Sequence, residues 1–224
     1  MLVKICGITR LEDAECAVKC GAGALGFVFW PGSPRCVDPE RARAIVSAIP
    51  TAVMTVGVFV NQTSAEVNLV AETVGLRAIQ LHGEESAAYA LGMTRPIIKA
   101  IALADSTDAA IDAWPAGTLI LLDAHDPSRR GGTGRTVDWE RAAAVSRRRP
   151  IVLAGGLRPE NVAEAVATVR PFGIDVSSGV ETTPGVKDHD LLRALFSAVE
   201  GARPFHPAPD SERPRPRDRR VRDI

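Results

Sequence analysis

Eight short apolar runs rich in Val, Ile, Leu and Ala recur along the chain, and their spacing constrains the fold more than any other feature of the sequence. They cover residues 2–8, 23–29, 54–60, 77–83, 97–103, 118–124, 150–156 and 173–179. Successive runs start 20 to 32 residues apart, which matches one β-strand followed by one helix. Eight such units favour a closed parallel barrel over the alternative, an open doubly wound sheet. We therefore predict an α/β chain whose residues 1–200 form a single (β/α)8 TIM barrel, the catalytic domain.

The segments between the runs carry helical periodicity. In residues 188–199, Leu192, Leu195 and Val199 fall on one face, and residues 160–169 repeat the same spacing. Thr9 and Glu12 have the spacing of a capping box before a helix over residues 11–22. Aromatic residues make up only 4% of the chain, so we expect an aliphatic core, as is usual for buried parallel strands.

The charge of the chain is balanced but unevenly distributed. The 27 basic and 27 acidic residues argue against nucleic acid or an anionic membrane as the main partner. Residues 201–224 hold seven Arg against four acidic residues, together with five Pro, a composition typical of disorder. We predict a disordered Pro/Arg-rich tail there; a nucleic-acid-binding arm is the alternative interpretation.

The four cysteines all lie within the first 36 residues, and no two of them form a C-x-x-C pair. A disulfide framework would not be confined to one end of the chain, which favours a reducing, cytoplasmic compartment. No signal peptide is recognised, and no apolar run approaches 18 residues. Cys16 and Cys20 are four residues apart without a further ligand, so the sequence predicts no metal site there.

Polar and reactive side chains stand where the predicted strands end. Active sites of TIM barrels lie at the carboxyl ends of the strands, so these side chains are expected to meet at one rim. The residues at or just after the strand ends are Cys6, Arg35, Asn61, His82, Asp123, Gly155, Gly156, Ser177 and Ser178.

The seventh and eighth strand ends carry the sequences LAGGL and DVSSGVE. Glycines at such turns let backbone N–H groups approach an anion closely, and barrels frequently bind phosphate with these two loops. The GGTGRT segment (131–136) adds a third glycine-bearing loop. Tight turns without a ligand are the alternative, but three such loops on adjacent units favour a phosphate site.

Cys6 and Asp123 offer a base and an acid on opposite sides of the predicted barrel mouth. A thiolate can take a proton from carbon, and a partly buried carboxyl can give one to oxygen. Lys4 projects to the same side of its strand as Cys6, and its ammonium group is expected to favour the thiolate. Taken alone, Cys6 also fits a small buried apolar residue, and Asp123 also fits a loop cap. A facing acid and base would suit the isomerisation of a phosphosugar.

The motifs KICGIT, GFVFWPGSPR, LLDAHDPSRRGGTGRTVDW, LAGGLRPENV and DVSSGVETTPGVKDHDLL together resemble the phosphoribosylanthranilate isomerase family of tryptophan biosynthesis. The resemblance extends from Lys4 to about Val199. It implies a cofactor-free Amadori rearrangement, an aldose–ketose isomerisation. N-(5-phosphoribosyl)anthranilate would become 1-(2-carboxyphenylamino)-1-deoxyribulose 5-phosphate.

The resemblance also implies residue roles. Cys6 would be the general base and Asp123 the general acid, while Arg35 would contact the anthranilate carboxylate. Asp175 would face the anthranilate nitrogen, and His82 would line the pocket or serve packing. The implied phosphate-binding residues are Gly134, Gly155, Gly156, Ser177 and Ser178. Cys36 departs from the family pattern, in which a bulkier residue is expected after the arginine.

The small-molecule substrate is the only expected partner, with no cofactor, metal, nucleic acid or membrane; no oligomeric state is predicted.

Three alternatives compete with this interpretation. A Schiff-base aldolase would use Lys99, which lies in the fifth run. A metal-dependent epimerase would need several histidines and carboxylates at strand ends, where only His82 among the four histidines clearly stands. A non-catalytic phosphate-binding barrel would leave Cys6 inert.

Overall fold

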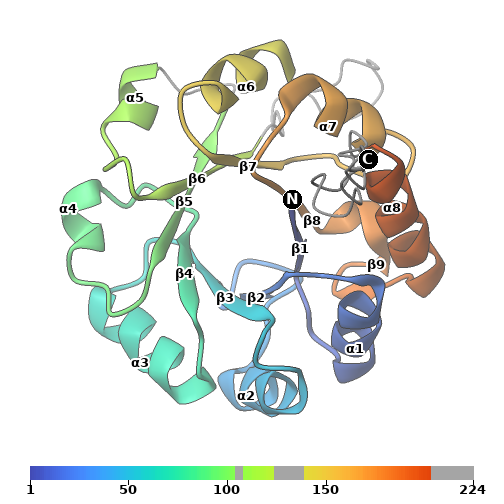
Figure 1. The fold of residues 1–224 in the computed structure, drawn as a ribbon. Coiled ribbons are helices and arrows are strands. Elements are labelled where there is room, and N and C mark those ends of the chain that lie inside the picture. The colour runs from blue at the N-terminus through green and yellow to red at the C-terminus, as the bar shows by residue number, and fades with distance from the viewer. Residues whose placement is uncertain (104–107, 124–138, 203–224) are drawn as a thin grey trace, which may run out of the picture.

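Eight parallel strands close into a barrel in sequence order, each one pairing with the next and β8 pairing with β1 (Figure 1). The structure is a computed structural model that describes residues 1–103, 108–123 and 139–202. The strands are β1 (Leu2–Cys6), β2 (Ala24–Val28), β3 (Met54–Phe59), β4 (Ala78–Leu81), β5 (Ile97–Ala102), β6 (Leu119–Asp123), β7 (Ile151–Ala154) and β8 (Gly173–Val176). All eight coincide with the predicted runs, so the predicted TIM barrel is confirmed.

A ring of helices surrounds the barrel (Figure 1). The helices in the described residues are α1 (Leu11–Cys20), α2 (Pro39–Ala48), α3 (Ser64–Val74), α4 (Ala87–Ala90), α5 (Asp108–Asp112), α6 (Trp139–Ser146), α7 (Val162–Val169) and α8 (His189–Gly201). None of them combines the length and the apolar character needed to cross a membrane. Most of the predicted tail (residues 203–224) and the predicted phosphate-binding Gly134 lie outside the described residues.

The predicted capping box at the first helix is wrong. Helix α1 has Arg10 at its N-cap, whose side chain makes no capping hydrogen bond. The hydroxyl group of Thr9 instead donates a 2.5 Å hydrogen bond to the carbonyl oxygen of Gly185. A true capping box is found at α3, where Thr63 and Glu66 satisfy each other's backbone N–H groups. The Thr9 side chain therefore serves a long-range contact rather than its own helix.

Apolar side chains fill two layers. Small and aliphatic residues point into the barrel from alternate strand positions: Ala24, Val56, Ala78, Ile98, Ala100, Leu121, Val152 and Ala154. A larger cluster fills the space between strands and helices and includes Ile5, Leu25, Phe27, Ile120, Leu153 and Leu195. Above the inner layer, Cys6, Val28 and Val58 form a small separate cluster at the ends of the first three strands. These apolar side chains thus fill the barrel interior, and the polar residues at the strand ends lie above them.

A short hairpin follows the last barrel strand and was not expected from the sequence. A 3-10 helix, η1 (Ser178–Val180), leads into β9 (Glu181–Thr183), which pairs antiparallel with β10 (Val186–Lys187). Gly185 takes φ = 83° in the turn between them, a conformation that favours glycine. Asp188 then caps α8 by accepting hydrogen bonds from the N–H groups of Asp190 and Leu191. The hairpin consequently places Glu181 and Lys187 beside the barrel mouth.

Candidate active site

A cavity of about 560 Å³ opens at the carboxyl ends of the strands. Its walls come from β1, the loop after β2, and the ends of β3, β4, β6, β7 and β8. Nine of the ten predicted site residues line it: Cys6, Arg35, His82, Asp123, Gly155, Gly156, Asp175, Ser177 and Ser178. The tenth, Gly134, lies outside the described residues. The structure therefore brings these nine residues into one cavity. Asn61, which also stands at a predicted strand end, does not line it; its Oδ1 accepts a hydrogen bond from the N–H group of Glu84.

Cys6 is the last residue of β1 and is 8% exposed. Burial raises the pKa of its thiol, and the positive charges of Lys4 and Lys187 act in the opposite direction. Burial prevails, so the pKa lies above the ordinary thiol value. Lys4 does favour the thiolate as predicted, but the depth of the site outweighs it. The thiol needs a neighbour without a side chain, because a Cβ on Gly26 would lie 2.7 Å from its Sγ.

Lys4 lies beneath Cys6 and pairs with Asp175. Its Nζ donates a 2.9 Å hydrogen bond to Asp175 Oδ1, and both side chains are buried. Burial lowers the pKa of Lys4, but Asp175 and Cys6 outweigh burial and hold that pKa above its ordinary value. Lys4 is therefore charged at neutral pH, and Asp175 lines the cavity while bound to it.

Asp123 ends β6 and faces a histidine. His82 Nε2 lies 3.5 Å from Asp123 Oδ2, and His82 Nδ1 lies 3.0 Å from Gln80 Nε2. Gln80 is fully buried, and its Oε1 has no hydrogen-bond partner within the described residues. His82 thus stands between a buried amide and the predicted acid rather than simply lining the pocket.

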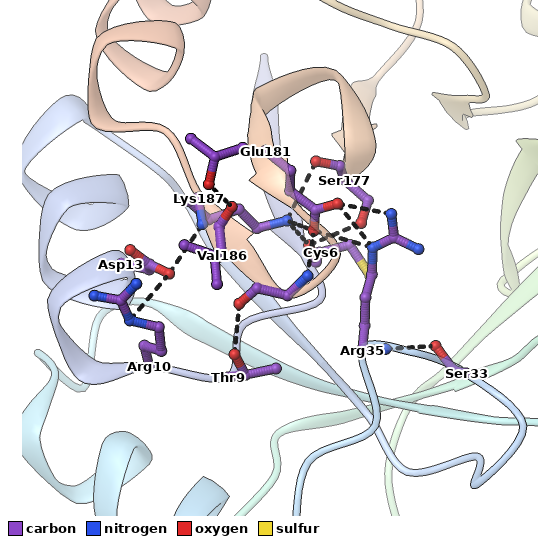
Figure 2. Close-up of polar contacts among 12 residues, drawn as sticks. Cys6, Thr9, Arg10, Asp13, Ser33, Arg35, Ser177, Glu181, Val186 and Lys187 are labelled. Carbon is purple, nitrogen blue, oxygen red and sulfur yellow. Dashed lines mark hydrogen bonds and ion pairs between the residues drawn. The ribbon is translucent and has the colours of Figure 1, made fainter.

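Arg35 reaches the cavity from the loop after β2 and is held by an acidic residue that sequence analysis missed. Its Nε lies 3.0 Å from both carboxylate oxygens of Glu181, and its Nη2 lies 2.6 Å from Oε2 (Figure 2). Lys187 Nζ donates to Glu181 Oε1 at 2.7 Å and to the carbonyl oxygen of Cys6 at 2.6 Å. The only sequence pattern that pointed to these residues was the GVETTPGVKD segment of the resemblance, which assigned them no role.

Burial raises the pKa of Glu181, and hydrogen bonds from Arg35 and Lys187 outweigh it, so this pKa lies below the ordinary value. Burial lowers the pKa of Lys187, and the contact with Glu181 only partly compensates. Glu181 is therefore ionised at neutral pH. The hairpin presents a carboxylate between two cationic side chains.

The loops after β7 and β8 hold the residues that the sequence predicts to bind phosphate. Gly155 and Gly156 take φ = 91° and 65°, and within the described residues their backbone N–H groups donate to no other group. A Cβ on Gly179 would lie 1.9 Å from the carbonyl oxygen of Leu157, so the two loops touch backbone to backbone. The Ser177 hydroxyl group donates to the carbonyl oxygen of Cys6 at 3.1 Å. The glycine turns leave backbone donors available, as an anion site requires.

The structure also places the groups that the competing interpretations would use. Lys99 is buried and donates to Glu85 Oε2 at 2.8 Å and to the carbonyl oxygen of Gly83 at 2.6 Å. It is not among the residues that line the cavity. Within the described residues, no three His, Cys, Asp or Glu side chains gather in a way that could hold a metal ion.

Comparison with known proteins agrees with this geometry. Residues 3–198 match the family model described as N-(5'-phosphoribosyl)anthranilate (PRA) isomerase. The N-(5'-phosphoribosyl)anthranilate isomerase of Pseudomonas fluorescens (strain Pf0-1) is 48% identical over 198 residues, which cover 88% of this chain and 97% of that protein. The crystal structure of phosphoribosyl anthranilate isomerase from Thermotoga maritima is 44% identical, with a TM-score of 0.80, covering 90% of this chain and 99% of that one.

A further solved phosphoribosyl anthranilate isomerase is in complex with reduced 1-(o-carboxyphenylamino)-1-deoxyribulose 5-phosphate. It is 42% identical to this chain, with a TM-score of 0.78, and the match covers 90% of this chain and 100% of that one.

Proposed function

The chain belongs to the N-(5'-phosphoribosyl)anthranilate isomerase family, and from that premise we propose how its own residues divide the chemistry. The reaction converts N-(5-phosphoribosyl)anthranilate into 1-(2-carboxyphenylamino)-1-deoxyribulose 5-phosphate, a step of tryptophan biosynthesis. It is an aldose–ketose isomerisation in which C1' is reduced while C2' is oxidised, so a base and an acid suffice.

Asp123 is the general acid of the first step. Its carboxyl group gives a proton to the furanose ring oxygen, the ring C–O bond breaks, and the nitrogen lone pair forms the Schiff base. The position of Asp123 at the end of β6, on the cavity wall, supports this role. His82, 3.5 Å away, contacts the carboxyl group that must carry the proton.

Cys6 is the general base of the second step. Its thiolate removes the proton from C2', the electron pair moves into the C1'–C2' bond, and the Schiff-base nitrogen is neutralised to give an enolamine. Tautomerisation of the enolamine returns a proton to C1' and leaves the ketone at C2'. The buried thiol favours this role, because a base with a raised pKa accepts a proton from carbon more readily once ionised.

The remaining cavity residues bind the substrate. Arg35 contacts the anthranilate carboxylate, for which a guanidinium group is the best-matched donor. Asp175 accepts the hydrogen bond of the anthranilate nitrogen. Gly155, Gly156, Ser177 and Ser178, together with Gly134 outside the described residues, bind the phosphate. At the glycine turns it meets backbone N–H groups that make no hydrogen bond to the described part of the chain.

One observation carries this proposal: Cys6 and Asp123 line one cavity, together with the arginine and the glycine loops that the two ends of the substrate require. The test measures the loss of phosphoribosylanthranilate fluorescence in the presence of purified protein, of Cys6→Ala and of Asp123→Asn. Each variant is expected to lose roughly 10²- to 10⁴-fold in kcat, which is the usual contribution of a general acid or base.

Matched controls are Cys20→Ala on helix α1 and Asp112→Asn on helix α5, which make the same changes away from the cavity. Circular dichroism checks that all variants are folded. Full activity in either site variant would remove that residue from the mechanism. An inactive parent protein would overturn the proposed function as a whole.

A further inference from the structure

Among the described residues, the side-chain hydrogen bonds of Arg35 all lie along one edge of its guanidinium group. Glu181 contacts Nε and Nη2, while the remaining nitrogen, Nη1, points away from Glu181 (Figure 2). The Glu181 side chain is 4% exposed and that of Arg35 is 23% exposed. The Nε–Nη2 edge thus meets a buried residue of the protein, and Arg35 also lines the cavity.

Lys187 completes a cluster of three charges. Its Nζ donates to three acceptors, which are Glu181 Oε1 and the carbonyl oxygens of Cys6 and Ser177. The 2.7 Å contact between Lys187 Nζ and Glu181 Oε1 is an ion pair, as formed by an ammonium group and a carboxylate. Together with Arg35 and Glu181 it leaves one net positive charge. Without Lys187, the Arg35–Glu181 pair would be neutral, and the buried Glu181 would repel an incoming carboxylate.

We propose that Glu181 and Lys187 are positioning residues that prepare Arg35 for the carboxylate of the substrate. Glu181 fixes the guanidinium group by its Nε–Nη2 edge, so that the Nη1 side meets the substrate. Lys187 keeps the cluster attractive to an anion and anchors the β9–β10 hairpin to the backbone of the base, Cys6. This inference depends on the role proposed for Arg35 above.

The physical advantage is preorganisation. A long arginine side chain at a cavity rim samples several rotamers and loses that freedom when a ligand binds. A guanidinium group that is already fixed by a bidentate contact avoids this loss, which lowers the KM for a carboxylate-bearing substrate. The same contacts also join the loops after β1, β2 and β8, so a purely structural role for Glu181 is the competing explanation.

Two substrates separate the explanations. One is N-(5-phosphoribosyl)anthranilate, and the other is N-(5-phosphoribosyl)aniline, which lacks only the carboxylate. For Glu181→Gln we expect the KM of the first substrate to rise about tenfold, as for a lost charge-assisted contact, with kcat changed by less than about twofold. The KM of the aniline substrate is expected to stay within about twofold of the parent value, because Arg35 has no partner on it.

A double-mutant cycle tests whether Glu181 acts through Arg35. In an Arg35→Met background, Glu181→Gln should no longer change the KM of the carboxylate substrate. Lys187→Met, measured in the same way, should show the same selectivity for the carboxylate substrate. Glu15→Gln on the outer helix α1 is the matched control and should change neither KM.

The outcomes are distinct. If folded Glu181→Gln raises the KM of both substrates alike, or lowers only kcat, its role is structural and the inference is wrong. Lys187→Met decides in the same way if Glu181→Gln does not fold. If Arg35→Met fails to discriminate the two substrates, the role proposed for Arg35 is wrong, and the inference fails with it. If Arg35→Met discriminates but Glu181→Gln does not, only the inference made here is overturned.

Discussion

Lys4 and Asp175 are register partners on the adjacent strands β1 and β8, and their side chains form a 2.9 Å ion pair directly below Cys6. The two charges have opposite effects on the pKa of the thiol, since Lys4 lowers it and Asp175 raises it. Removing one partner of a buried pair leaves the other uncompensated, at a cost of roughly 3–5 kcal/mol. The ion pair is thus both part of the barrel core and part of the environment of Cys6, the proposed base.

The pH dependence of catalysis should report this environment. The raised pKa of Cys6 means that kcat/KM rises with pH and levels off only above about 8.5, the ordinary thiol value. In Lys4→Met a positive charge is lost, the thiolate is less stable, and the profile should move further to alkaline pH. Lys19→Met, which changes an exposed lysine on α1, should keep the parent profile. An unchanged profile in folded Lys4→Met would show that Lys4 does not act on the base.

Gly26 on β2 provides the space that Cys6 occupies. A Cβ at this position would lie 2.7 Å from Cys6 Sγ and 3.0 Å from Lys4 Nζ. Both are the ends of side chains that can move, so Gly26→Ala should fold with a loss of about 1–3 kcal/mol in the free energy of unfolding. The displaced thiol should nevertheless reduce kcat on the order of 10²-fold. Gly117→Ala, with no atom within 4 Å of the new methyl group, is the control. A fully active Gly26→Ala would argue against a strictly placed thiol.

Much of this site could be predicted from the sequence, because strand periodicity fixes which residues stand at the strand ends. Predicting Cys6, His82 and Asp123 as site residues required only the eight apolar runs and the rule that barrel sites lie at the carboxyl ends of the strands. Glu181 and Lys187 could not be found in this way. Their strands span three and two residues, too short for a period, and Glu181 meets Arg35 across 146 positions of sequence.

The sequence also could not weigh opposing electrostatic effects. It indicated that Lys4 lies on the same side as Cys6, but the depth of the thiol is a property of the folded barrel. Burial exceeds the effect of the ammonium group, so the pKa of Cys6 is raised although Lys4 acts on it in the predicted direction. The capping box predicted at Thr9 was wrong for a related reason. The Thr9 hydroxyl group donates its hydrogen bond to the carbonyl oxygen of Gly185, 176 positions away.

The contact between the loops after β7 and β8 should control phosphate affinity. A Cβ on Gly179 would overlap the carbonyl oxygen of Leu157 at 1.9 Å, and that neighbour is backbone, which cannot rotate aside. Gly179→Ala should therefore separate the two loops and raise the KM about tenfold or more. Competitive inhibition by ribose 5-phosphate isolates the phosphate end and should weaken by a similar factor. Equal inhibition constants for parent and variant would place the phosphate elsewhere.

Glu85, in the loop after β4, and Lys99, on β5, form another buried ion pair. Glu85 also accepts hydrogen bonds from the N–H groups of Asn61 and Gly83. Burial raises the pKa of Glu85, but the hydrogen bonds from Lys99 and from the N–H group of Asn61, together with the charge of Lys99, outweigh burial, so the pKa lies below the ordinary value. Glu85→Gln leaves the Lys99 ammonium unpaired, and the free energy of unfolding at pH 7 should fall by about 3–5 kcal/mol.

The sign of the pH effect follows from the lowered pKa. Glu85 contributes stability above the carboxyl pKa of the unfolded chain, about 4.3, and this contribution is lost as the pH falls through the lower pKa of the folded state. Urea denaturation of the parent and of Glu85→Gln should therefore give curves that differ at pH 7 and converge in acid. Glu160→Gln, an exposed carboxylate on the loop before α7, should match the parent at both pH values. A constant difference between parent and Glu85→Gln at all pH values would mean that Lys99 is stabilised by groups other than the Glu85 charge.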